Sequence, residues 1–292
     1  MINLPLPAGV SRQLVPTARG PVPVLCGRPR AGAPTAEVVM ASGFFGTKED
    51  FREVLALLAA AGVRGWAYDY RGQLDPAHPA RGYSIGALAC DLRDVAHAVG
   101  GGRPVHLIGH CLGGFVARSA VLAEPGLARS LTLLSCGPNM LTGKHRAMLD
   151  GLAQLHANGG TMMLWPLVRK LLAEDDTVMR DFWRTKLASM NPRWVTGIAE
   201  SMATEPDRTD EVQASGLPAL VVHGKRDRRL WSAAEYAALA GRLQAGYHVI
   251  ERASHSPNME QPAATASVLL DFWASAEHAH AGRHRKPAAV IW

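Results

Sequence analysis

One cysteine stands where the residue types best suit covalent chemistry. Cys111 is the centre of the run GHCLGG at residues 109–114, after the apolar run VHLI at residues 105–108. Glycines around a central residue allow a sharp turn from strand to helix, which presents that residue as a nucleophile. A lone buried cysteine is more often an inert small hydrophobe. Here the helix dipole favours the thiolate, so we predict that Cys111 is a nucleophile.

A thiol nucleophile needs a base, and His255 is the best placed of the chain's 12 histidines. It lies in the run ASHSPN at residues 253–258, directly after a predicted strand at residues 247–251. A histidine on such a loop can reach over the sheet edge toward a nucleophile on a neighbouring strand. We therefore predict His255 as the base, and expect most other histidines at the surface or in the core.

An orienting carboxylate is expected at Asp227, which ends the run LVVHGKRD at residues 220–227. The run predicts a buried strand with an acid in the turn after it. A surface ion pair is the alternative, because lysine and arginine surround Asp227. The order nucleophile, acid, histidine along the chain favours a catalytic role.

Acyl transfer also requires hydrogen-bond donors for a developing oxyanion. We predict two backbone N–H groups, one from Leu112 and one from Phe44, with Phe45 as the second choice in the same loop. Residues 42–46, SGFFG, follow a predicted strand at residues 37–41, and their glycines let the backbone approach a substrate. An ordinary glycine turn is the alternative for this loop alone.

Alternating strand and helix patterns surround these residues and predict a mostly parallel sheet covered on both faces. The predicted strands cover residues 13–17, 22–26, 37–41, 65–68, 104–108, 130–134, 219–223 and 247–251. The predicted helices cover residues 48–61, 85–99, 115–122, 233–243 and 263–276.

The alternation stops between residues 138 and 214, where apolar residues recur at helical spacing. We predict a helical lid there, inserted into a core formed by residues 1–137 and 215–277. The candidate substrate-binding residues are Trp165 and Trp183 of the lid, together with Phe45 and His110. The latter two lie near the sharp turn at Cys111, which we call the elbow. Plain helix packing is the alternative for the lid tryptophans. The basic tail at residues 278–292 is expected to be flexible.

Composition excludes several classes of protein. The 292 residues carry a net charge of +6, but the densest basic cluster is a short terminal run, RHRK at residues 283–286, so nucleic acid is disfavoured. A surface attractive to anionic substrates or carriers remains open. No apolar run reaches the roughly 18 residues of a membrane span, and no signal peptide is expected.

The four cysteines, Cys26, Cys90, Cys111 and Cys136, lie far apart without a C-x-x-C pair. We therefore expect no disulfide framework, no metal site and a reducing cytoplasm. No cofactor motif is present, and we expect no cofactor.

In combination, the motifs resemble the α/β-hydrolase superfamily over residues 22–276. The matching runs are SGFFG at 42–46, DYRG at 69–72, GHCLG at 109–113, GKRD at 224–227 and HSPNMEQP at 255–262. The resemblance implies an eight-stranded, mostly parallel sheet with a helical lid, and a triad of Cys111, His255 and Asp227.

Three residues depart from the usual pattern of this superfamily. Ser42 stands where histidine is common, and Ser254 replaces a glycine. Cys111 replaces serine, which is similar to dienelactone hydrolases, some carrier-linked thioesterases and polyhydroxyalkanoate synthases, although the chain is too short for a full synthase of that kind.

A thiolate–imidazolium pair attacks without removal of a proton in the transition state, and its acyl-enzyme is a reactive thioester. We therefore predict an acyl-transfer enzyme: a thioesterase or ester hydrolase, or an acyltransferase or cyclase, acting on a small-molecule, carrier-linked or coenzyme A-linked acyl group. Natural-product biosynthesis is one context for such an enzyme. The alternatives are a lyase or isomerase of the same fold and a non-enzymatic binding protein. The oligomeric state is left open.

Overall fold

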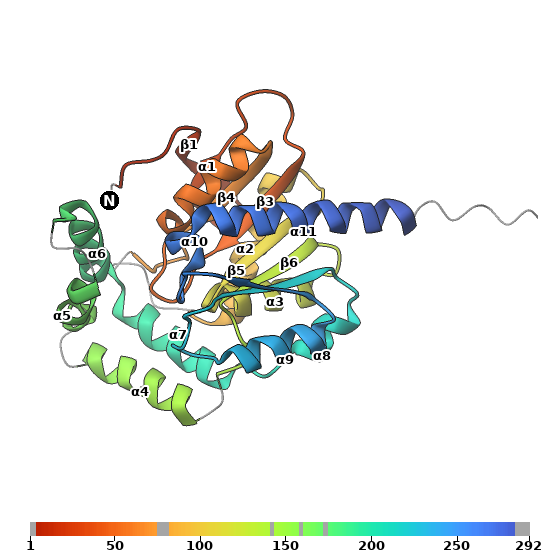
Figure 1. The fold of residues 1–292 in the computed structure, drawn as a ribbon. Helices are drawn as coiled ribbons and strands as arrows, with labels where there is room; N and C mark the ends of the chain where they lie inside the picture. Colours follow the sequence, from red (N-terminus) through yellow and green to blue (C-terminus); the bar gives the residue numbers. More distant parts are fainter. Residues whose placement is uncertain (1–3, 75–81, 141–142, 158–159, 172–174, 284–292) are drawn as a thin grey trace, which may run out of the picture.

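The computed structural model describes residues 4–74, 82–140, 143–157, 160–171 and 175–283, and contains one eight-stranded sheet (Figure 1). The strand order is β1-β2-β4-β3-β5-β6-β7-β8. Strands β1 and β2 pair antiparallel, as do β2 and β4, whereas the other neighbours are parallel. The strands are β1 Val10–Thr17, β2 Gly20–Gly27, β3 Ala36–Ala41, β4 Val63–Tyr68, β5 Val105–His110, β6 Ala128–Leu134, β7 Ala219–Gly224 and β8 Gly246–Ile250. The predicted mostly parallel sheet is confirmed.

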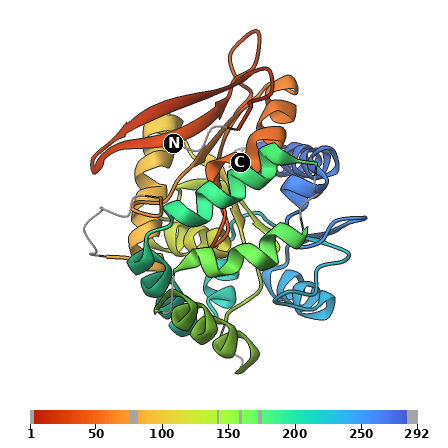
Figure 2. The same cartoon turned by 90° about the vertical axis from the view of Figure 1, so that its left-hand side faces the viewer.

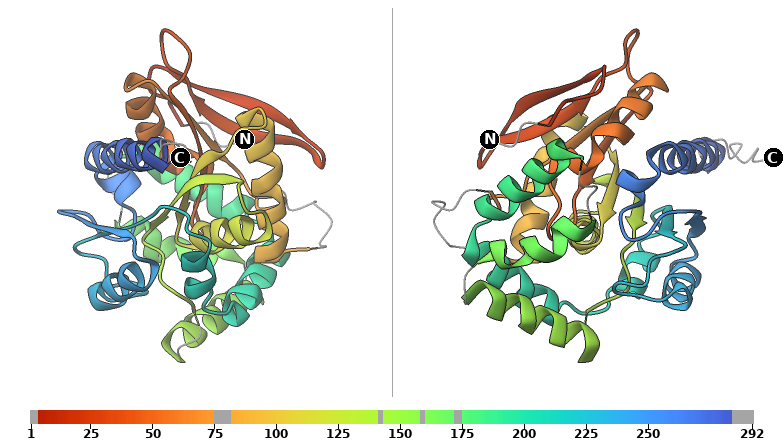
Figure 3. Two further views of the ribbon diagram at one scale, coloured as in Figure 1. Left: turned by 90° about the vertical axis from the view of Figure 1, so that its right-hand side faces the viewer. Right: turned by 60° about the vertical axis from the view of Figure 1, so that its left-hand side comes forward.

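Helices cover both faces of the sheet, which explains why the central strands are continuous apolar runs. On β3, Val38 and Met40 pack with the helices α1 Arg52–Ala60 and α11 Pro262–Arg283. Val39 and Ala41 face the opposite core. The helices on that face are α2 Ile85–Gly100, α3 Leu112–Ala123 and α9 Ala233–Leu243 (Figure 3). Every residue of β5 and β7 is buried.

Several predicted boundaries differ from the observed ones. The predicted helix at residues 48–61 is a 3₁₀ turn, η1 Lys48–Phe51, followed by α1. The short helix α10, Pro257–Glu260, comes before α11. Helix α11 continues to Arg283, beyond its predicted end at Ala276. Residues 284–292 of the predicted tail lie outside the described residues.

The segment at residues 138–214 is helical, and its described residues contain no strand. Most of it faces the viewer in Figure 2. Its helices are α4 Gly143–Ala157, η2 Thr161–Leu164, α5 Trp165–Val168, η3 Arg169–Leu171, α6 Thr177–Ser189, α7 Pro192–Thr204 and α8 Thr209–Ala214. Helix α7 buries Trp194, Ile198 and Met202 in the main core, and α4 packs against α7. That the segment acts as a lid stays a prediction. No helix in the described part of the chain is long and apolar enough to cross a membrane.

Helix α3 packs so closely against the end of β3 that glycine is required at its second residue. A Cβ atom on Gly113 would collide with the backbone carbonyl of Ala41 and lie 2.9 Å from that of Ser42. We expect Gly113→Ala to lower the free energy of unfolding by about 1–3 kcal/mol, since backbone must move to admit the methyl group. Urea denaturation measures this change.

Gly241→Ala is the matched control, because Gly241 lies in α9 with nothing within 4 Å of an added Cβ. That substitution should raise the free energy of unfolding by about 0.5–1 kcal/mol through helix propensity. Equal stability of Gly113→Ala and the unsubstituted protein would contradict the close approach of α3 and β3.

Candidate active site

Cys111 lies in the sharp turn between β5 and α3, as the glycine pattern predicts. Its backbone has φ 50° and ψ −111°, a region that residues with a side chain rarely adopt. The Cys111 N–H donates to the Leu134 carbonyl at 2.9 Å, and the Gly114 N–H donates to the Cys111 carbonyl at 3.0 Å. A Cβ on Gly109 would overlap the backbone of Gly113. The turn therefore fixes the backbone of Cys111 at the end of β5.

His255 and Asp227 lie together at the same edge of the sheet. Asp227 lies in the turn after β7, and its Oδ2 is 2.9 Å from Nδ1 of His255, in the loop after β8. The Tyr236 hydroxyl donates to Oδ2 at 2.8 Å, and the Arg229 N–H donates to Oδ1 at 3.1 Å. Asp227 is 4% exposed, so it is not a surface ion pair; the neighbouring Lys225 pairs with Glu251.

The charges around His255 favour its imidazolium form. Burial acts to lower the pKa of His255, but the hydrogen bond to Asp227 and the interaction with the Cys111 side chain raise it to about 9. Burial likewise acts to raise the pKa of Asp227, but its hydrogen bonds, above all with His255, hold it below the ordinary value. Because Asp227 engages Nδ1, Nε2 is the ring nitrogen left for the sulfur.

His110, a predicted substrate-binding residue, lines the cavity and also fixes the His255 loop. Its Nε2 donates to the backbone carbonyl of His255 at 2.8 Å. Burial lowers the pKa of His110 to about 3, so the ring is neutral. No local pattern predicts this second contact, because it joins residues far apart in the chain.

The loop after β3 lies beside the elbow and is fixed by buried polar side chains. A Cβ on Gly43 would lie 3.5 Å from Cβ of Cys111. The Tyr70 hydroxyl donates to the Ser42 carbonyl at 2.7 Å, and Gln73 Nε2 donates to the Gly46 carbonyl at 2.8 Å. Neither side chain was predicted as part of the site, although Tyr70 belongs to the matching run DYRG. Phe44 lies in this loop, and Leu112 begins α3, where its N–H has no partner inside the helix.

One cavity of about 180 Å³ joins these elements, and it contains both Cys111 and His255. Of the predicted substrate-binding residues, Phe45, His110 and Trp183 line it. Trp165, in α5, is not among its described lining residues. The apolar wall is completed by Phe44, Met148, Leu149, Met202, Leu230 and Met259.

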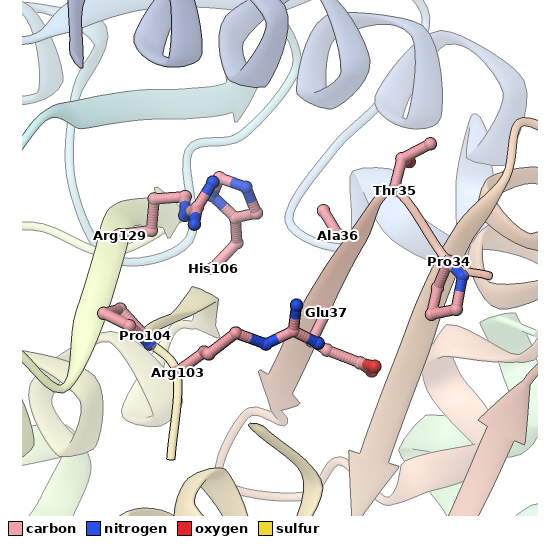
Figure 4. A pocket seen from close by; sticks show the side chains of 8 residues that line it. All are labelled: Pro34, Thr35, Ala36, Glu37, Arg103, Pro104, His106 and Arg129. Atoms are coloured by element: carbon pink, nitrogen blue, oxygen red, sulfur yellow. The ribbon is translucent and has the colours of Figure 1, made fainter. Parts of the chain in front are cut away.

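A second, smaller cavity lies at the opposite edge of the sheet, where β3, β5 and β6 begin (Figure 4). It has a volume of about 40 Å³ and contains His106, Arg103 and Arg129, but no cysteine. Nδ1 of His106 is 2.7 Å from the Ser130 hydroxyl. The catalytic candidates all lie at the other edge. In the part of the chain that the structure describes, no three or more His, Cys, Asp or Glu side chains are grouped so that they could hold a metal ion.

The raised pKa of His255 gives a pH dependence with a definite sign. The folded protein binds the imidazole proton more tightly than the unfolded chain, whose histidine titrates near 6.5. This proton therefore stabilises the fold fully below pH 6.5, and the contribution is lost as the pH rises through about 9. We expect NMR titration to give a raised His255 pKa, lowered in Asp227→Asn and in Cys111→Ala. An unchanged pKa in both variants would contradict the assigned causes.

Comparison with known proteins gives the family of the chain. Residues 38–268 match the Alpha/beta hydrolase family. A Pantoea ananatis protein with the provisional name carbamate hydrolase RutD is 27% identical over 266 residues, covering 87% of this chain and 93% of that protein. A Variovorax paradoxus protein of the same name is 35% identical over 123 residues, which are 42% of this chain and 46% of that protein. A thermophilic esterase from Thermogutta terrifontis shares the fold, with a TM-score of 0.75 at 21% identity, and the match covers 91% of this chain and 99% of the esterase. The chain belongs to the alpha/beta hydrolase family.

Proposed function

We propose that this alpha/beta hydrolase is an enzyme of acyl transfer that works through a thioester on Cys111. One observation carries the proposal. Cys111, at the strained elbow, lines the same cavity as His255, and His255 is paired with Asp227. A binding protein has no need of a buried acid–imidazole pair beside a thiol. Among the described residues that line the cavity, none specifically favours lyase or isomerase chemistry.

The first half of the proposed reaction forms the acyl-enzyme. The Cys111 thiolate attacks the acyl carbonyl carbon, and the carbonyl oxygen takes up negative charge. Backbone N–H groups of Phe44 and Leu112 would donate to that oxygen. The bond to the leaving group then breaks, and the His255 imidazolium gives its proton to the departing oxygen or sulfur. The products are the free leaving group, neutral His255 and an acyl thioester.

In the second half, water, an alcohol, an amine or a thiol attacks the thioester carbonyl. The attacking atom bonds to the acyl carbon, the carbon–sulfur bond breaks, and the acceptor's proton passes to His255. The thiolate–imidazolium pair is thereby restored. A thioester is more reactive toward amines and thiols than a serine ester, so transfer to such acceptors can compete with hydrolysis when water is excluded.

The cavity suits an acyl donor whose acyl chain is apolar, because methionine, leucine and aromatic side chains form most of the cavity wall. The exposed Arg229 also lines it and could meet an anionic portion of a carrier or coenzyme A donor. Carbamate hydrolysis and ester hydrolysis, for which the similar proteins are named, are both substitutions at a carbonyl carbon. An accessory role in natural-product biosynthesis is part of the same proposal.

Selective alkylation tests whether Cys111 is an activated thiol. Iodoacetamide should label Cys111 at least about tenfold faster than Cys26 or Cys136. Both of the latter are fully buried, and burial raises the pKa of Cys26 and raises that of Cys136 to about 12. Peptide mass spectrometry over time measures the rates, with guanidinium-unfolded protein as the control. Uniform labelling of the native protein would argue against an activated thiolate.

Intact-mass spectrometry tests the acyl-enzyme directly. With butyryl-coenzyme A or p-nitrophenyl butyrate, we expect one acyl group on Cys111, most abundant in His255→Ala, where deacylation lacks its base. Cys111→Ala should carry no adduct and lose turnover by about 10³-fold or more. Cys111→Ser should keep hydrolysis better than transfer, since its acyl ester is less activated. If no activated donor acylates the protein, the thioester mechanism is wrong.

A further inference from the structure

A carboxyl group backed by a buried lysine lines the cavity, and the proposed reaction does not use it. Asp50 belongs to η1 and shares the cavity with Cys111. Nζ of Lys186, from α6, lies 3.6 Å from Oδ1 of Asp50. The Lys186 side chain is fully buried, and that of Asp50 is 6% exposed. Asp50 is the single carboxylic acid among the described residues that line the cavity.

The charged atoms of this pair have unused hydrogen-bonding capacity. Oδ1 of Asp50 and Nζ of Lys186 lack a hydrogen-bond partner in the part of the chain that the structure describes. Nζ lies instead 3.6 Å from the centre of the Trp183 ring. Burial of an ion pair is costly unless its remaining hydrogen-bond sites are filled. Because Asp50 lines the cavity, its carboxylate is suited to accept a hydrogen bond from a donor carried by a ligand.

Neighbouring charges decide what kind of ligand fits. Lys48 Nζ lies 3.0 Å from Glu49 Oε1 and 2.5 Å from Asp69 Oδ2, so three carboxyl groups share two lysines in this region. Burial raises the pKa of Asp50 despite the nearby Lys186. An anionic ligand group would meet excess negative charge there. A neutral N–H or O–H group would instead fill the open hydrogen-bond site.

Asp50 also lies at the far end of the loop that approaches Cys111. A Cβ on Gly46 would be 2.7 Å from Oδ2 of Asp50, while Gly43, at the loop's other end, packs against Cys111. Because the rest of the wall is largely apolar and fits the acyl chain, the polar group nearest Asp50 would belong to the acyl acceptor.

We propose that Asp50 binds the acyl acceptor by accepting a hydrogen bond from its neutral N–H or O–H group, and that Lys186 holds Asp50 in place. The acceptor is therefore an amine or alcohol that has a neutral N–H or O–H group, such as an amide N–H, in addition to the proton that its attacking atom loses to His255. This assignment rests on the proposed acyl transfer. Asp50 makes and breaks no covalent bond: the acceptor's proton goes to His255, and the acyl carbon–sulfur bond breaks, as in the second half of the reaction. A fixed acceptor orients the nucleophile and favours it over water.

The test measures binding in Cys111→Ala protein, which cannot be acylated, so it does not depend on turnover. Two ligands of equal shape are compared by NMR titration: N-butylacetamide, which has an N–H donor, and butyl acetate, which has none. We expect the amide to bind about tenfold more tightly than the ester. Adding Asp50→Leu with Lys186→Met should abolish that preference. Replacing both partners avoids an unpaired buried charge, and thermal unfolding checks that the protein remains folded.

The control replaces an exposed ion pair away from the cavity, Arg208→Met with Glu211→Leu, and should keep the preference for the amide. An equal ratio of affinities in the Asp50/Lys186 variant and the control would overturn the proposal. Acylation of Cys111 without any amide preference would reject Asp50 as the acceptor site while the proposed function stands. An amide preference without acylation would keep the site and reject the thioester mechanism.

Discussion

The whole site depends on the close contact of three backbone segments at the end of β5. Gly109, Gly113 and the carbonyl of Ala41 approach so closely that no side chain fits between them. This contact holds Cys111 at a positive φ, and the core around α3 must supply the energy for that conformation. The same packing puts the start of α3 beside the loop after β3. The positions of the predicted nucleophile and of the predicted oxyanion donors are therefore set by one backbone contact.

Electrostatics add a second constraint, because the acid and imidazole are both buried. Burial opposes the charged form of each, yet the pair keeps Asp227 ionised and His255 protonated. The Tyr236 hydroxyl and the Arg229 N–H fill remaining acceptor sites on Asp227, which reduces the cost of burying its charge. An imidazolium stabilises a thiolate, but it cannot accept a proton from a serine hydroxyl. Cysteine thus suits this arrangement, in which the proton already resides on the ring.

The sequence predicted those parts of the molecule that follow from local patterns. Apolar runs predicted the strands of the sheet. Cys111, Asp227 and His255 were predicted to lie together because each follows a strand whose end lies at the same edge. Tyr70, Gln73 and the second contact of His110 depend on residues distant in the chain, so no local pattern marks them. No pattern in the sequence distinguishes Trp165 from Trp183 as a residue that lines the cavity. The packing of α6 places Trp183 there.

Lys186 shows why the helical segment cannot be treated as a passive cover. A lysine on an amphipathic helix is normally solvated, yet this one is fully buried against Trp183 and directed toward Asp50. Asp50 in turn packs on Gly46 of the loop after β3, and its backbone carbonyl accepts a hydrogen bond from Asn258, three residues after His255. Displacement of α6 would leave Asp50 without its counter-ion beside the loops that follow β3 and β8. The position of α6 and the charge inside the cavity are therefore coupled through the Asp50–Lys186 ion pair.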